Sequence, residues 1–147
     1  MADIARNRQA AYKYNFLEKW EAGLQLQGSE VKSLRNGGVQ LKDSFATVSD
    51  GEVWLHNMHI APYAPASREN HEPERSRKLL LHRGEIERLI GRTAEKGLTL
   101  IPTRLYWKNG RAKVEIALAR GKNVQDKRRY LKEKDARREI QQALQER

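Results

Sequence analysis

The chain has 147 residues, of which 38% are hydrophobic, and it carries a formal net charge of +10. This length favours one domain with an extension, and the charge indicates a polyanionic partner. No stretch approaches the roughly 20 apolar residues of a membrane span, and the absence of cysteine excludes a disulfide framework or a thiolate zinc site. The first residues lack the apolar run of a signal peptide, so we expect a cytoplasmic protein.

The N-terminal third begins with polar and basic residues, which predict a flexible arm over residues 1–11. Apolar side chains then alternate with polar ones at Tyr12, Tyr14, Phe16, Ala22, Leu24 and Leu26. A period of two is typical of strands with one buried face. Gly23, within this segment, predicts a bulge or a sharp bend.

A short helix and a hairpin follow. Gly28-Ser29 opens the helix with Ser29 as the expected N-cap, and Gly37-Gly38 ends it. Residues 39–48 predict a strand, and the tight turn at Asp50-Gly51 leads into its antiparallel partner.

The second half of the body contains a proline-rich loop, a helix and a second hairpin. Residues 61–75 predict the loop, residues 83–96 the helix and residues 98–107 a strand. Asn109-Gly110 is the strongest hairpin signal in the chain. We therefore expect a mainly β fold with helices (α+β): an oligonucleotide-binding-type barrel over residues 12–119 with two or three added helices.

The last 28 residues, 120–147, predict a basic tail. They hold ten Lys or Arg against five Asp or Glu, and so supply half of the net charge. Their few large apolar residues cannot form a core, so we expect the tail to be disordered when free. Ile140 and Leu144 lie four residues apart, which favours a helix once the tail lies on a polyanionic surface.

The sequence offers little evidence for catalytic chemistry. His56 and His59 are three apart in a predicted strand, so they point to opposite faces and make a poor metal pair. No glycine-rich phosphate loop or nucleophile elbow is present. Glu21 and Glu30 are a weak candidate for a carboxylate pair. We expect a protein that is not an enzyme and that uses neither a metal nor a cofactor.

Basic and aromatic residues interleave at Tyr12-Lys13-Tyr14, Tyr106-Trp107-Lys108 and Arg128-Arg129-Tyr130. Cations contact phosphates while aromatic rings stack on unpaired bases, a combination that suits single-stranded or irregular RNA. The first two triplets fit core packing equally well. Arg75-Ser76-Arg77-Lys78 adds a basic cluster, for which a solvated face is the alternative interpretation.

Segment 28–35, GSEVKSLR, with EAGL at residues 21–24, closely resembles the signature of the bacterial tmRNA-binding protein family, also called SsrA-binding protein or small protein B. The resemblance covers nearly the whole chain, with motifs in the family's order and spacing. The other matching segments are RKLLL at residues 77–81, LYWKN at 105–109, ARGK at 119–122 and DKR at 126–128.

This resemblance implies an RNA-binding adaptor that binds the tRNA-like domain of tmRNA and takes it to stalled ribosomes for trans-translation. It implies tmRNA-binding roles for Glu21, Leu80 and Lys113, to which we add Arg77 and Lys78. An acid on an RNA-binding face has to accept hydrogen bonds from a base, a ribose hydroxyl or a neighbouring cation. An internal salt bridge is the alternative for Glu21.

The resemblance also implies that the tail lies in the decoding centre and the empty mRNA channel, where it becomes helical. The expected partners are tmRNA and small-subunit rRNA, and we expect a monomer. The chain departs from the family at two positions. Members usually have histidine or an aromatic residue where this chain has Gln125, and lysine where it has Gly38. The tail residues that we expect to bind the ribosome are Lys122, Asp126, Lys127, Arg128, Arg129, Tyr130, Lys132, Lys134, Arg137 and Arg138.

Two other functions are compatible with the sequence. A structural ribosomal protein would share the basic charge and the tail. A small RNA nuclease would use Glu21 or Glu30 together with a histidine.

Overall fold

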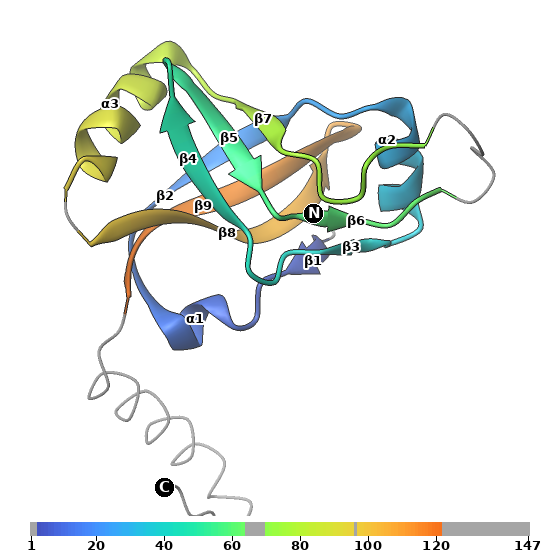
Figure 1. Ribbon diagram of the computed structural model, residues 1–147, viewed down its shortest axis with the longest axis horizontal. Coiled ribbons are helices and arrows are strands. Elements are labelled where there is room, and N and C mark those ends of the chain that lie inside the picture. Colours follow the sequence, from blue (N-terminus) through green and yellow to red (C-terminus); the bar gives the residue numbers. More distant parts are fainter. Residues whose placement is uncertain (1–2, 64–69, 96, 122–147) are drawn as a thin grey trace, which may run out of the picture.

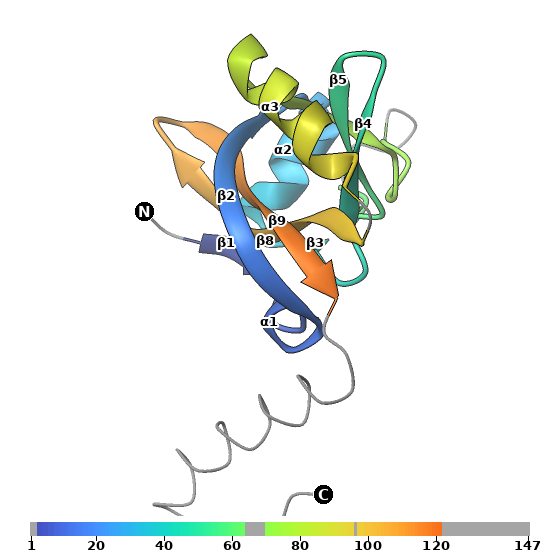
Figure 2. The same ribbon diagram turned by 90° about the vertical axis from the view of Figure 1, so that its left-hand side faces the viewer.

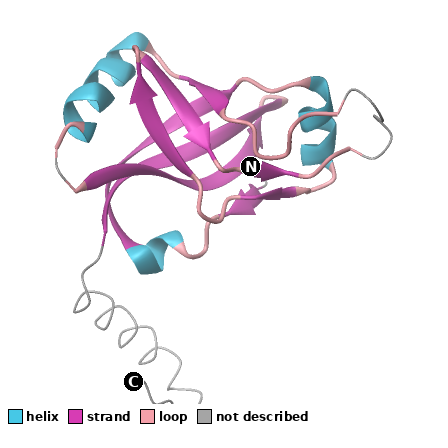
Figure 3. Cartoon of the chain, in the orientation of Figure 1, coloured by secondary structure: helices cyan, strands magenta, loops and turns pink. Residues whose placement is uncertain are grey.

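The computed structural model describes residues 3–63, 70–95 and 97–121, and strands make up about half of this part of the chain (Figure 3). The elements in chain order are β1 (Asp3–Arg6), α1 (Ala10–Lys13), β2 (Tyr14–Leu24), α2 (Gly28–Arg35), β3 (Val39–Gln40), β4 (Phe45–Ser49), β5 (Glu52–His56), β6 (His59–Ile60), β7 (Arg77–Leu80), α3 (Arg83–Thr93), β8 (Leu98–Lys108) and β9 (Arg111–Gly121).

The main sheet closes into an antiparallel barrel. Its strand order is β1-β8-β4-β5-β7-β2-β9, and β8 also pairs with β9, which joins the two sides of the sheet (Figure 1). Closure removes most of the unpaired edges that an open sheet presents. This architecture confirms the predicted oligonucleotide-binding-type barrel with helices. None of the helices in the described residues is long and apolar enough to cross a membrane.

Strands β2 and β9 run side by side over one face of the barrel (Figure 2). Tyr14 pairs with Gly121 at one end, and Gly23 pairs with Lys113 at the other. The register shifts between Phe16 and Glu18, so a bulge lies there, whereas Gly23, where we predicted a bulge or a sharp bend, pairs with Lys113 without a register shift. The extra residue reverses which side chains face inward, so Tyr14 and Phe16 face outward while Trp20 and Ala22 face inward, although the alternation in the sequence keeps one phase throughout.

The bulge divides the apolar side chains of β2 between two clusters. Beyond it, Trp20 and Ala22 join the main core inside the barrel. Before it, Tyr14 and Phe16 pack on the outside, against a small cluster of Ala10, Ile101 and Ala119. The barrel therefore carries a second apolar cluster on its outer surface, beside the start of β2.

Local turn chemistry determined both predicted hairpins. Asp50 and Gly51 connect β4 to β5, and Asn109 and Gly110 connect β8 to β9, all four with positive φ. This is the geometry that Asp-Gly and Asn-Gly pairs favour in two-residue turns. The strand predicted over residues 39–48 is instead split into β3 and β4.

Residues 3–11 do not form the loose arm that we predicted over residues 1–11. Strand β1 pairs with β8, and the Asp3 carboxylate accepts a hydrogen bond from Arg104 at 2.8 Å. Ala10 is buried in the outer cluster. Backbone pairing and one long-range ion pair thus order a segment whose own composition is polar. At the other end β9 continues to Gly121, past the predicted boundary at Arg120, and residues 122–147 lie outside the described part.

Helix α2 begins with a capping box, and its N-cap is not Ser29 as predicted. Gln27 is the N-cap, and its backbone N–H donates to the Glu30 carboxylate at 2.8 Å. The Ser29 hydroxyl instead bonds to Nδ1 of buried His71, whose Nε2 lies 2.8 Å from the Ile60 carbonyl oxygen. His71 therefore ties α2 to the loop and to β6.

Candidate nucleic-acid interface

Three neighbouring strands bring Leu80, Gly23 and Lys113 side by side on the outside of the barrel. Gly23 of β2 pairs with Leu80 of β7 on one side and with Lys113 of β9 on the other. A β-carbon at Gly23 would lie 3.3 Å from the Leu80 β-carbon and 3.7 Å from the Lys113 Nζ. The glycine therefore allows the two side chains to meet over β2, and we call this surface, with Glu21, the outer patch.

Strand alternation explains why the two side chains of the patch face outward. Leu79 and Val114, their immediate neighbours, are buried in the main core, so Leu80 and Lys113 point away from it. Leu80 is 50% exposed, which is unusual for a large aliphatic residue in a strand. Within the described residues, Lys113 forms no salt bridge, so its ammonium group is available for an external anion.

Glu21 lies two residues before Gly23 on the same face of β2. Its carboxylate accepts a hydrogen bond from the Tyr106 hydroxyl at 2.5 Å and lies 3.2 Å from the Lys108 ammonium group. The Tyr106 hydrogen bond, followed by Lys108 and the charge of Lys113, holds the pKa of Glu21 below its ordinary value, against a smaller effect of burial. The carboxylate is thus ionised and oriented while still partly open to solvent.

Tyr106 contributes to this patch, although it was not among the predicted tmRNA-binding residues. Burial, and then the hydrogen bond to Glu21, raise the pKa of the Tyr106 phenol, so it remains a donor at neutral pH. The sequence signal was the Tyr106-Trp107-Lys108 triplet, of which two members contact Glu21. The predicted alternative for Glu21, an internal salt bridge, is therefore present with Lys108, and it coexists with partial exposure.

The face continues along β2, β8 and β9 with paired charges. Lys19 and Arg104 flank Glu115 at 3.6 and 3.8 Å. The Arg104 guanidinium also lies 4.3 Å from the centre of the Tyr106 ring.

Arg77 does not belong to this surface. It is fully buried and donates to the Glu30 carboxylate at 2.7 Å, as well as to the carbonyl oxygens of Met58 and Pro73. Our assignment of Arg77 to tmRNA binding is therefore corrected to a structural role. The reason is strand alternation in β7, which places Arg77 and Leu79 inside and Lys78 and Leu80 outside.

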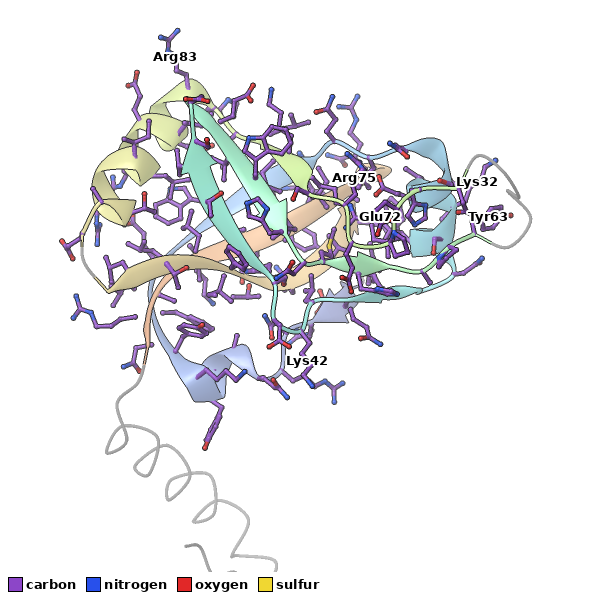
Figure 4. All side chains as sticks on the ribbon, viewed as in Figure 1. Lys32, Lys42, Tyr63, Glu72, Arg75 and Arg83 are labelled. Carbon is purple, nitrogen blue, oxygen red and sulfur yellow. The ribbon has the colours of Figure 1, made fainter. Side chains whose placement is uncertain are left out.

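Glu30 is also fully buried, so it cannot pair with Glu21 in an active site. Burial pushes the pKa of Glu30 upward, but hydrogen bonds from Arg75, the Gln27 N–H and Arg77 outweigh it, and the net shift is downward. Figure 4 shows Arg75 on the side of the molecule that carries α2, the helix to which Glu30 belongs. Among the described residues, no group of three or more His, Cys, Asp or Glu side chains is arranged to hold a metal.

The Lys78 side chain points outward, and its charge is paired with an acid. Its ammonium group lies 2.7 Å from the Glu52 carboxylate, and about a third of the side chain is exposed. An RNA contact from Lys78 stays a prediction. The ten predicted ribosome-binding residues of the tail, from Lys122 to Arg138, lie outside the described residues.

Comparison of the sequence with known proteins shows the family to which the chain belongs. The SmpB protein family model matches residues 4–146. The chain belongs to the SmpB family. An SsrA-binding protein of Carboxydothermus hydrogenoformans is 57% identical over 141 residues, which cover 96% of this chain and 95% of the relative. One of Geobacillus thermodenitrificans is 59% identical over 144 residues, 98% of this chain and 93% of that one.

A solved structure carries the same family name. It is described as "tmRNA-SmpB: a journey to the center of the bacterial ribosome" and matches with a TM-score of 0.70 at 47% sequence identity, covering 99% of this chain and 100% of that one. The recognition made from the sequence motifs is therefore confirmed.

One of the two departures from the SmpB pattern has a structural explanation. A β-carbon at Gly38 would lie 3.0 Å from the Ser33 hydroxyl oxygen and 3.1 Å from the Ala61 β-carbon. The Ser33 hydroxyl donates to the Ala61 carbonyl at 2.6 Å, which holds these groups close to Gly38. A lysine there would require these groups to shift by a few tenths of an ångström. Gln125, the other departure, lies outside the described residues.

Proposed function

We propose that this chain is an RNA-binding adaptor of trans-translation, which binds the tRNA-like domain of tmRNA through the outer patch and takes it to stalled ribosomes. The observation that carries the proposal is the meeting of Leu80 and Lys113 over Gly23, next to an ionised and oriented Glu21. The names of its relatives, and the structure described with tmRNA and the ribosome, support the same partner.

The patch offers three different contacts to one RNA. Lys113 supplies a cation for a phosphate, and Leu80 supplies an apolar surface for a ribose or base face. Glu21 repels phosphate, so RNA binds well only where a base N–H or a ribose 2′-hydroxyl lies opposite its carboxylate. This acid therefore favours one placement of the RNA over others, so the patch contributes specificity as well as affinity.

We further propose that residues 122–147 enter the decoding centre and the empty mRNA channel. Strand β9 ends at Gly121 opposite Tyr14, at the far end of β2 from Gly23. Nine residues of strand separate these points, or about 30 Å at 3.3 Å per residue. Two RNAs can therefore bind at opposite ends of β2 without competing for the same surface.

A gel-shift titration tests the RNA partner directly. The full chain is titrated against the tRNA-like fragment of tmRNA and against an ordinary tRNA at the same salt concentration. We expect markedly tighter binding to the tmRNA fragment, because non-specific phosphate attraction acts equally on both. Equal affinity for the two RNAs would refute the proposal.

A truncation tests the division of labour between barrel and tail. Ending the chain at Gly121 preserves the full pairing of β9 with β2. We expect this variant to bind the tRNA-like fragment normally and to lose tagging of nascent chains on stalled ribosomes. Normal tagging by the truncated chain would contradict a role for residues 122–147.

A further inference from the structure

A hollow of about 230 Å³ lies on the outside of the barrel, where α1, β4, β8 and the start of β2 meet. Ala10 and Ile101, both almost fully buried in the outer cluster, line it with Tyr14 and Phe45. Phe45 is 37% exposed, and its ring lies 5.1 Å from the His56 ring. One water occupies about 30 Å³, so the hollow has room for a flat heterocycle beside these apolar and aromatic residues.

Polar side chains make up the rest of the lining of this hollow: Asn7, Gln9, Lys13, Asp43, Ser44 and Thr99. The Asn7 side-chain amide donates to the Pro102 carbonyl at 2.9 Å, which leaves its own carbonyl oxygen as an acceptor. The Thr99 hydroxyl makes no hydrogen bond to any described residue. Proteins hold unstacked bases of RNA by stacking on aromatic side chains and by hydrogen bonds to the base edges, and this lining offers both kinds of contact.

A second hollow, of about 300 Å³, adjoins the first one and shares Asn7 and Gln9 with it. Arg6, Arg8 and Lys42 line it, between β1 and β3. Neither Arg8 nor Lys42 forms a salt bridge within the described residues, and the Arg6 pair with Asp3 is exposed on the arginine side. Because the two hollows share lining residues, these cations lie on the side of the first hollow where the phosphate of a bound nucleotide could follow its base.

We propose that the two hollows form one nucleotide-binding site, which takes an unpaired base between Tyr14 and Phe45 and its phosphate beside Arg8 and Lys42. The inference rests on the proposed function, because RNA is the partner that supplies unpaired bases. The site is separate from the outer patch: Tyr14 pairs with Gly121, at the end of β2 from which the chain continues into the basic tail. The base comes either from the tRNA-like domain of tmRNA or from small-subunit rRNA.

The test compares Phe45→Ala with Phe45→Tyr in the full chain. Each variant is titrated against the tRNA-like fragment and against purified small ribosomal subunits. We expect Phe45→Ala to weaken binding to one of these RNAs by roughly tenfold, since stacking on an aromatic ring contributes strongly per base, whereas Phe45→Tyr keeps the ring and binds within about twofold of the original chain. The RNA that responds is the source of the base.

Ile90→Ala is the matched control, because Ile90 is 46% exposed but lies on α3. If thermal melting shows that Phe45→Ala unfolds, Thr99→Phe replaces it, since a ring there fills the hollow without removing an existing wall. Unchanged affinity of Phe45→Ala, or of Thr99→Phe, for both RNAs overturns the inference. The proposed function fails separately, through equal affinity of the original chain for the tRNA-like fragment and ordinary tRNA.

The phosphate half of the site has its own test. Lys42→Ala is compared with Arg83→Ala, because these cations lie on opposite edges of the molecule (Figure 4). We expect Lys42→Ala to reduce the salt dependence of binding to the RNA that responds to Phe45→Ala by about one counterion. An equal or larger reduction with Arg83→Ala overturns the placement of the phosphate.

Discussion

The two faces of β7 show how one basic motif is divided between stability and recognition. Arg77 faces the interior, where it pairs with Glu30, while Leu80, three residues later, is half exposed on the outer patch. The buried arginine contributes to the net charge of the chain but offers nothing to RNA, whereas the exposed leucine is uncharged and lies where RNA binds in our proposal. Charge counts therefore cannot locate the interface, and strand alternation can.

Substitution of Glu30 should have the largest effect, and it should act on stability. Glu30→Gln leaves the buried Arg77 guanidinium without its counter-charge, which destabilises by about 3–5 kcal/mol in comparable pairs. We expect a large drop in the denaturant midpoint. Affinity for the tRNA-like fragment should stay unchanged wherever the variant is folded, and a selective loss of RNA binding without a loss of stability would show that the inner face takes part in recognition.

Acidification should weaken the same pair. The pKa of Glu30 in the folded chain is lower than its ordinary value of 4.5, so its contribution to stability is fully present above that pH and is lost as the pH falls through the lowered pKa. The difference in unfolding free energy between the original chain and Glu30→Gln should narrow below about pH 4.5. A constant difference down to pH 3 would contradict this.

Leu80→Ala should have a smaller effect, and it should act on the affinity for RNA and not on stability. Half of the Leu80 side chain is already exposed, so stability should change little. Loss of its apolar contact with RNA should cost about 1 kcal/mol, or roughly a fivefold increase in the Kd for the tRNA-like fragment. Ile90→Ala, with similar exposure, should leave this Kd unchanged, and equal effects of the two substitutions would remove Leu80 from the interface.

The smallest effect should come from the Lys78–Glu52 pair, which lies on the outside of β7 and β5. A partly exposed ion pair contributes at most about 1 kcal/mol, because water and salt screen it. A double-mutant cycle with Lys78→Ala and Glu52→Ala should give a coupling energy below that value. A coupling energy as large as the loss of stability in Glu30→Gln would contradict the account, in which the inner face of β7 stabilises the fold much more than the outer face does.

Local signals in the sequence predicted much of the fold. Asp50-Gly51 and Asn109-Gly110 specified both hairpins, because their preference for positive φ acts within two residues. The period of two identified β2, although the bulge was misplaced. What the sequence could not reveal depends on distant partners: Arg77 meets Glu30 across 47 residues, and Asp3 meets Arg104 across 101.

The outer patch shows the same limit. The resemblance to a known family indicated Glu21, Leu80 and Lys113, but not their arrangement. Tyr106 lies 85 residues from Glu21, and only the register of β2, β9 and β8 brings its hydroxyl to that carboxylate. The period of two over residues 77–80 does contain a signal for Arg77: it places this arginine on the same face as the apolar Leu79.

The most direct test of the outer patch is a pair of charge reversals that change the net charge equally. Lys113→Glu places an acid beside Glu21 on the patch, and Arg83→Glu places one on α3, where the arginine is 93% exposed. Loss of a charged hydrogen bond costs about 1.5–3 kcal/mol, so we expect Lys113→Glu to raise the Kd for the tRNA-like fragment roughly ten- to a hundredfold. Arg83→Glu should have little effect at moderate salt. Equal weakening by both reversals, or no weakening by Lys113→Glu, would contradict our placement of the RNA.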